Sequence, residues 1–333
     1  MPRRTRRALP GVVLAAALLL SACGGGSSET PAASEAPASS AAVVTITHKF
    51  GTTTVPANPT RVLTVGFNEQ DFAIALGVEP VGAREFLGYD APQRPWLPED
   101  LRGKALPTVG SQEIAFEQVA ALAPDLILGI NSSMDQATYD KLSALAPTVA
   151  QSDAYADGGT PWDEQTRQTG AALGKASEAE QLVTDVKDRF AAVRSANPSF
   201  AGKSASFLLG GDQAGVYSLS TSDYRTGWLT ELGFTVPEKD ATVGLERLDA
   251  VDADVVMAEG LTDSVTGSKL WGAVDAVRED RFVDFGRFDQ HFAAALGFNS
   301  PLSLPFVLTE AEPRLAAATD GDVATVPEPF PAP

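Results

Sequence analysis

One pattern of apolar and polar positions occurs twice along the chain. "FEQVAALAPDLILG" begins at Phe116 and "LERLDAVDADVVMA" begins at Leu245. Both start with an apolar residue and Glu, continue with apolar residues at helical spacing, and end with Asp and a short apolar run. Each copy therefore predicts a helix that leads into a buried strand. A helix feeding a strand is half of a βαβ unit, so the repetition predicts two related α/β lobes.

Segments around these copies extend the repeat. Short apolar runs predict buried strands at residues 61–66 and 206–211, and each is followed by a predicted short helix, which begins near Asn68 and Tyr224 respectively. Asn68 is a candidate N-cap, and Gly77 is a candidate for the residue after the helix. Four more segments complete the pattern: a hairpin at 43–56, a strand at 78–83, and a helix then a strand at both 139–150 and 270–285.

A long amphipathic helix is predicted between the lobes, in "ASEAEQLVTDVKDRFAAVRSANP". Ser177 and Glu180 match a capping box, and Asn197 with Pro198 would end the helix. The length is about 20 residues, or roughly 30 Å. A single long helix is a stiff connection, so we expect only a small closure of the lobes. The apolar stripe consists of Leu182, Val183, Val186, Phe190 and Val193.

The N-terminus has the pattern of a secretory signal. Residues 1–10 are rich in arginine, and residues 11–20 form an apolar run that is too short to span a bilayer as a helix. "LSAC" then resembles a bacterial lipobox, which implies cleavage before Cys23 and lipidation of its thiol. An ordinary signal peptide with an unrelated Cys is the alternative. The residues after Cys23 are small and polar and predict a flexible tether.

These patterns give a domain division of the whole chain. The fold class is α/β, with two Rossmann-like lobes joined by a long helix and a ligand cleft between them, because clefts between domains are common sites for small ligands. The predicted segments are a signal peptide at 1–22, the lipidated Cys and tether at 23–42, an N-terminal lobe at 43–165, an interlobe helical segment at 166–199, a C-terminal lobe at 200–318 and a disordered tail at 319–333.

Composition excludes several classes of protein and site. The net charge is −18, which disfavours binding to nucleic acid. With one Cys and two His residues, the chain has no disulfide framework, no Cys-based zinc site and no cage of several His ligands. The sequence also lacks G-x-S-x-G, a P-loop and G-x-G-x-x-G after a strand, so we do not expect an enzyme. A surface adhesion lipoprotein would leave the twofold repeat unexplained.

The chain resembles a known family in several motifs taken together. The lipobox and tether, "TITHKFGTTTVPANPTRVLTVG", "FEQVAALAPDLIL", "SALAPTVAQ", the long central helix and "FNSPLSLPFVL" are similar to substrate-binding lipoproteins of bacterial ABC importers for iron–siderophores (FecB-type, periplasmic-binding-protein-like II). The resemblance covers nearly all of residues 43–318. It implies a monomer, anchored through lipid on Cys23 to the extracytoplasmic face of the membrane. Its expected partners are a ferric siderophore and an ABC permease with its ATPase.

A ferric siderophore already saturates its iron, so we expect no direct metal ligand and no cofactor from the protein. The site instead requires aromatic walls and donors aimed at the chelating oxygens, a role that suits arginine. Loops at strand ends and the long segment 83–100 carry such residues, and the spacing of Tyr217 and Arg225 matches ligand contacts in relatives. The candidate ligand-binding residues are Phe67, Arg84, Tyr89, Trp96, Trp162, Tyr217, Tyr224 and Arg225.

Alternatives remain for the individual residues and for the ligand. Arg84 could form a surface ion pair, the tryptophans could pack loops or a helix start, and His291 is more typical of a loop than of a ligand. By the resemblance, one acid on the first helix of each lobe, Asp71 and Glu231, would dock the permease. The negative charge favours a neutral or cationic hydroxamate siderophore over an anionic tris-catecholate. Cobalamin or haem would suit the same fold.

Overall fold

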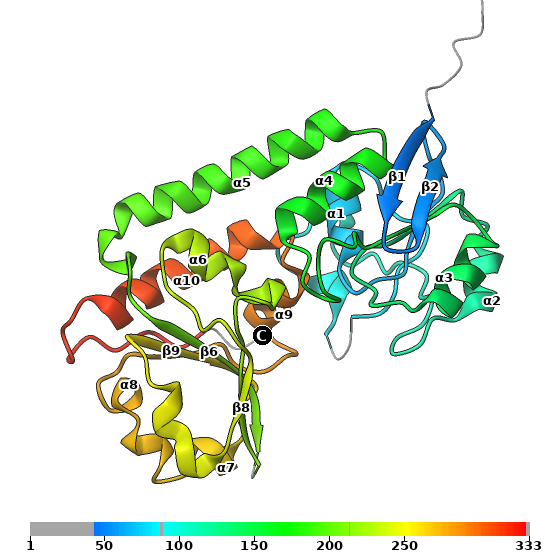
Figure 1. Cartoon of the computed structure of the whole chain (residues 1–333). Coiled ribbons are helices and arrows are strands. Elements are labelled where there is room, and N and C mark those ends of the chain that lie inside the picture. The colour runs from blue at the N-terminus through cyan, green and yellow to red at the C-terminus, as the bar shows by residue number, and fades with distance from the viewer. Residues whose placement is uncertain (1–42, 87–88, 213, 331–333) are drawn as a thin grey trace, which may run out of the picture. The chain divides into compact units, whose positions relative to one another are not determined.

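The computed structural model describes residues 43–86, 89–212 and 214–330 (Figure 1). The predicted signal peptide at 1–22, the lipidation of Cys23 and the tether up to residue 42 lie outside these residues. Within the described part of the chain, no helix is both long and apolar enough to cross a membrane.

The first lobe has a small parallel sheet with strand order β3-β4-β5. The predicted hairpin is confirmed, with β1 and β2 paired antiparallel, whereas residues 78–83 form only isolated bridges at Gly82 and Ala83. The elements in chain order are β1 (Val44–His48), β2 (Gly51–Val55), β3 (Val62–Thr64), α1 (Glu69–Ala75), η1 (Ala91–Gln93), η2 (Glu99–Leu101), α2 (Phe116–Ala121), β4 (Leu126–Gly129), α3 (Gln136–Ser143) and β5 (Thr148–Ala150).

The second lobe repeats this arrangement and adds an antiparallel edge. Its sheet order is β10-β9-β6-β7-β8, in which β6, β9 and β10 run parallel. Its elements in chain order are β6 (Ala205–Asp212), β7 (Gly215–Ser218), η4 (Tyr224–Thr226), α6 (Gly227–Leu232), β8 (Ala241–Val243), η5 (Leu245–Val251), β9 (Val255–Glu259), α7 (Asp263–Thr266), η6 (Trp271–Ala273), α8 (Asp275–Arg278) and β10 (Phe282–Asp284).

The two repeated stretches occupy equivalent places, as α2–β4 in the first lobe and η5–β9 in the second. The helix expected in the second copy is a 3₁₀ helix with a kink at Arg247, where φ is −124°. This copy has Asp249 where the first has the better helix former Ala120, which weakens an α-helix at this point. The strand after each helix is buried along its whole length, as predicted.

The long helix between the lobes is α5 (Ala176–Ala196), which follows α4 (Trp162–Ala172) and precedes η3 (Pro198–Phe200). It packs against α4 near its start and against α6 and α10 (Ser303–Thr319) further along, so it contacts both lobes (Figure 1). The predicted capping box is wrong, because the helix begins before Ser177 and its N-cap, Lys175, makes no side-chain cap. Val183, Val186 and Phe190 are buried, as the apolar stripe predicts.

A buried polar contact also joins the first lobe to the segment around α9 (His291–Phe298). Asp71 is fully buried and accepts hydrogen bonds from Arg94 Nε at 2.9 Å, Trp96 Nε1 at 2.7 Å and Ser300 Oγ at 3.1 Å. The side chain of Asn68 donates to the Phe298 carbonyl at 2.9 Å and makes no cap of α1. The lobes are therefore connected by this contact as well as by α5.

The C-terminal segment differs from the disordered tail that we expected from residue 319. Thr319 ends α10, and the chain then returns so that the ring of Phe330 lies 4.1 Å from that of Phe292, measured between centroids. The Arg314 guanidinium donates to the carbonyls of Glu328 at 2.9 Å and Pro329 at 3.0 Å. An aromatic residue near the end of the chain thus packs against the second lobe.

Replacing the buried carboxylate should destabilise the protein strongly. Asp71→Ala leaves the Arg94 charge and the Trp96 donor buried without their acceptor, so we expect a loss of about 3–5 kcal/mol in the free energy of unfolding. Urea denaturation measures this loss. Glu231→Ala, a partly exposed acid on α6, is the control and should change stability by less than about 0.5 kcal/mol. Equal effects of the two variants would contradict the structural role of Asp71.

Candidate ligand-binding site

A pocket of about 490 Å³ lies between the lobes. Its position fits the rule that ligands of α/β sheets bind beyond the carboxyl ends of the strands, because Phe67 follows β3, Asn131 follows β4 and Glu259 ends β9. We call it the interlobe pocket. Its lining comes from both lobes: Phe67, Phe86, Asn131, Ser133, Gly158, Tyr224, Arg225, Glu259, Phe288, Ala293 and Gly297.

The wall formed by the second lobe has an arginine that is held by a neighbouring acid. Arg225 donates from Nε and Nη2 to the two carboxylate oxygens of Asp223, at 2.9 and 2.7 Å. Although burial lowers the pKa of Arg225, these hydrogen bonds raise it above its ordinary value. Tyr224 is fixed beside it, since its hydroxyl donates to the Gly297 carbonyl at 2.8 Å, and burial raises its pKa to about 12. Two of the predicted contacts, Tyr224 and Arg225, thus line the pocket together.

Glu259 lines the same wall, and the sequence analysis did not select it. Its side chain is buried, with 3% of the residue exposed, and Oε2 has no hydrogen-bond partner among the described residues. Burial raises its pKa to about 8, against the opposing effect of the Arg225 charge. The available signal was an acid at the end of an otherwise apolar strand, "VVMAE", because such a residue reaches the strand end where ligands bind.

The wall formed by the first lobe is built on Phe67 and the arginine behind it. The Arg84 guanidinium lies 4.1 Å from the centroid of the Phe67 ring, in a cation–π contact. It also donates to the carbonyls of Ser111, at 2.5 Å, and of Gln112. Phe67 therefore lines the interlobe pocket as predicted, while Arg84 supports it from behind and lines two other pockets.

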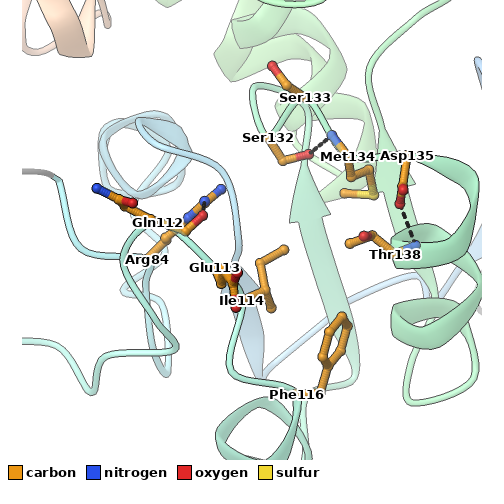
Figure 2. A pocket seen from close by; sticks show the side chains of 10 residues that line it. All are labelled: Arg84, Gln112, Glu113, Ile114, Phe116, Ser132, Ser133, Met134, Asp135 and Thr138. Carbon is orange, nitrogen blue, oxygen red and sulfur yellow. Dashed lines mark hydrogen bonds between the residues drawn. The ribbon is translucent and has the colours of Figure 1, made fainter.

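Figure 2 shows one of these other pockets, which lies within the first lobe and measures about 380 Å³. Arg84 and Gln112 line one side of it, and the turn of Ser132 and Ser133 lines another. Ser133 belongs to this pocket and to the interlobe pocket, so the two adjoin at that residue. The Arg84 charge thus faces a polar recess that opens next to the interlobe pocket.

A second buried acid fixes the turns behind the first-lobe wall. Glu69 is fully buried, and its Oε1 accepts the backbone N–H of Asn131. Burial raises its pKa to about 7, opposed by that hydrogen bond. The carboxylate folds over Gly66, where a Cβ atom would lie 2.0 Å from Oε2. Glycine at position 66 therefore leaves room for the Glu69 carboxylate beside the loop that presents Phe67, and a larger residue would displace that carboxylate.

Three predicted aromatic contacts lie in the core and do not line the interlobe pocket. Tyr89 and Trp96 stack with centroids 6.0 Å apart, and the Tyr89 hydroxyl is hydrogen-bonded to His291 at 2.8 Å. Trp162 starts α4 and packs against Phe190 of α5. Aromatic stacking buries all three rings in this conformation, so ligand contact by these residues has no support here and stays a prediction.

The remaining predicted residues divide between buried and exposed positions. Asp71 is buried by Arg94, Trp96 and Ser300, so it presents no carboxylate to a permease. Glu231 is partly exposed on α6, and its docking role stays a prediction. Tyr217 is 39% exposed and lines a neighbouring depression with Gly260 and Thr262, so its ligand contact also stays a prediction. Among the described residues there is no group of three or more His, Cys, Asp or Glu that could hold a metal ion.

Comparisons with known proteins match this architecture. The model of the periplasmic binding protein family matches residues 83–287. The chain belongs to this family. The probable siderophore-binding lipoprotein YfiY of Bacillus subtilis is 30% identical over 262 residues, which cover 70% of this chain and 77% of YfiY.

Two solved structures from the family superpose well. A periplasmic solute binding protein from Mycobacterium smegmatis is 35% identical, with a TM-score of 0.74, and the match covers 83% of this chain and 99% of that one. Streptococcus pneumoniae PiaA in complex with ferrichrome is 25% identical, with a TM-score of 0.73 and the same coverage. The relatives are thus binding proteins with the same two-lobed fold.

The two buried glutamates, Glu69 and Glu259, should make stability depend on pH. Because their folded-state pKa values of about 7 and 8 exceed the ordinary value of 4.5, the stabilisation is complete below about pH 4.5 and is lost as pH rises through 7 and 8. Replacing both, Glu69→Gln with Glu259→Gln, should therefore flatten the fall in unfolding free energy over this range by several kcal/mol, about 8 kcal/mol at most.

Thermal and urea unfolding at several pH values measure this difference. The control replaces the exposed acids at the second position of each repeated stretch, Glu117→Gln with Glu246→Gln, and should leave the pH profile unchanged. If the profiles of the wild type and of the variant lacking both buried acids were parallel, these acids would be ionised at neutral pH in the folded protein.

Proposed function

We propose that this protein captures a ferric siderophore, with a hydroxamate type favoured, in the interlobe pocket and delivers it to an ABC importer. The observation that carries the proposal is the pocket itself, where Arg225 lies beside the aromatic residues Phe67, Phe86 and Phe288. A ferric chelate is bulky and presents negatively polarised oxygens around its metal. An arginine donor and aromatic walls suit that surface, and no protein ligand to the iron is required.

The relatives support the ligand class. YfiY is named as a probable siderophore-binding lipoprotein, and PiaA was solved with ferrichrome, which is a hydroxamate complex. The net charge of −18 is a further reason to favour a neutral or cationic complex over an anionic tris-catecholate. The pocket volume of about 490 Å³ is within the range of small-molecule sites.

The cellular setting completes the proposal. Cleavage before Cys23 and lipidation of its thiol would anchor the mature protein to the extracytoplasmic face of the membrane, and the tether would let the lobes reach a permease. Of the two acids expected to dock the permease, Glu231 is partly exposed on α6, whereas Asp71 is buried. Docking on the first lobe would therefore use a different acid.

Binding of ferric ligands to the full chain in detergent tests the proposal. We expect saturable quenching of tryptophan fluorescence by sub-micromolar ferrioxamine, and weaker quenching by a ferric tris-catecholate and by the metal-free ligand. Arg225→Ala should weaken ferrioxamine binding about tenfold or more, because it removes a charged donor from the pocket. Arg247→Ala, which removes an exposed arginine of the same lobe, is the control.

The same titration includes cobalamin and haem, each with an inner-filter correction. Tight binding of either, without a response to ferrioxamine or the catecholate, would retain an importer component but overturn the iron assignment. Failure of Arg225→Ala to alter ferrioxamine binding would show that the ligand does not use this wall.

A further inference from the structure

The wall of the interlobe pocket formed by the second lobe has an acid that the proposed function leaves without a role. Glu259 ends β9, is 3% exposed and has one carboxyl oxygen, Oε2, without a hydrogen-bond partner among the residues described. A buried polar atom without a partner is costly, and native structures rarely retain one without a reason. Oε2 itself is closed off in this conformation, but its side chain lines the pocket, so a small turn of the carboxyl group would let a ligand group supply the missing donor.

The neighbouring arginine does not neutralise this acid. Both Nε and Nη2 of Arg225 are directed to Asp223, at 2.9 and 2.7 Å, and no ion pair between Arg225 and Glu259 is present. The charged residues that line the pocket are Arg225 and Glu259, and the first of these is already balanced by Asp223. An anionic ligand would therefore meet a site with no net positive charge.

An exposed aromatic ring stands next to the acid. Phe288 is 45% exposed, and its ring packs over Gly260, the residue after Glu259, where a Cβ atom would come within 2.9 Å of the ring. A carboxylate beside an accessible aromatic face suits an ammonium group, which gains an ion pair and a cation–π contact together. A neutral hydroxyl or amide donor would gain only the hydrogen bond.

We propose that Glu259 selects a ferric complex that carries a cationic amine, with the amine held between the Glu259 carboxylate and the ring of Phe288. This inference rests on the proposed function and specifies the class of siderophore: a hydroxamate complex with a free ammonium group. Complexes of the same size whose amine is blocked bind less tightly, and anionic complexes are disfavoured.

Protons provide an independent signature of this contact. Burial raises the pKa of Glu259 to about 8, so a bound ammonium ion must displace a proton from the carboxyl group to solvent. Affinity for the cationic complex therefore increases as pH rises towards 8, and a neutral complex shows no such increase.

The surroundings of Glu259 support assigning this titration to it. The groups that act on it are Asp223, Tyr224 and Arg225, and Tyr224 has a pKa of about 12, above the range in question. On the flanking strands, Leu209 of β6 lies opposite Glu259, and the lining from the first lobe is uncharged. The other charged groups on β10 and the loop after it are exposed: Asp284, Arg287 and Asp289.

The test uses two ligands that differ only in the amine: ferrioxamine B, a linear ferric trihydroxamate with a terminal ammonium group, and its N-acetylated form. Calorimetry with the full chain in detergent should show that the wild type binds the ammonium form about tenfold more tightly. Glu259→Gln should reduce this preference for the ammonium form over the acetylated form to less than about threefold. Glu246→Gln is the matched control on the same lobe.

Calorimetry at several pH values uses only the wild type, so it tests the role of Glu259 even if Glu259→Gln is unstable. Affinity for the ammonium form should increase about 20-fold from about pH 6.5 to 8.5, with release of about one proton per ligand when buffers of different ionisation enthalpy are compared. The amine itself, with a pKa of about 10, remains charged over this range.

The outcomes separate this inference from the function it rests on. Equal, pH-independent binding of both ferrioxamines overturns the role of Glu259 and leaves the siderophore function standing. Tighter binding of an anionic complex such as ferric citrate also overturns it. No binding of either ferrioxamine overturns the hydroxamate assignment and this inference together.

Discussion

The arrangement of the two lobes depends on one buried carboxylate. Asp71 of α1 collects donors from the long loop of its own lobe and from Ser300 at the start of the last helical segment. These donors are buried with it, so any large opening of the lobes would expose the Asp71–Arg94 charge pair and separate Asp71 from Ser300. Together with α5, which packs on both lobes, this contact makes the interlobe pocket a preformed site.

The charged side chains in and behind the interlobe pocket differ in whether they have partners within the protein. Arg225 is engaged by Asp223 through Nε and Nη2, and Arg84 by backbone carbonyls behind Phe67, so both guanidinium groups are partly hydrogen-bonded within the protein in this conformation. Two glutamates, Glu69 and Glu259, are buried, one in each lobe. Glu69 has a structural partner in Asn131, whereas Glu259 faces the pocket, and this difference separates scaffold from site.

Much of the fold could be predicted from local pattern. The repeat of helix and strand, the hairpin at Gly51 and the stripe on α5 are periodicity signals, and periodicity reflects burial directly. The kinked 3₁₀ helix at Arg247 and the start of α5 before Ser177 could not be predicted, because tertiary packing and small differences in helix propensity determine them. The order along the tail was missed because Phe330 is isolated among prolines and acidic residues in the sequence.

The site was predictable only where residue type and strand ends coincide. Phe67, Tyr224 and Arg225 follow strands and line the pocket. Tyr89, Trp96 and Trp162 were selected as aromatic residues in a loop or at a helix start, and all three are buried in the core. The neighbouring sequence does not distinguish an aromatic ring that stacks in the core from one that faces a ligand. Glu259 was not selected because an acid that follows an apolar run indicates only that the strand ends there. The sequence does not show that this acid faces a pocket.

The packing of Phe330 connects the C-terminal segment to a helix that lines the interlobe pocket. Its ring lies against Phe292 and Phe285, and Phe292 belongs to α9, the helix whose Ala293 and Gly297 line the pocket. Shortening the protein at Thr319 for crystallisation would uncover these rings and loosen that helix. Affinities measured on such a trimmed protein would then understate those of the intact molecule, so purification tags and truncations belong elsewhere.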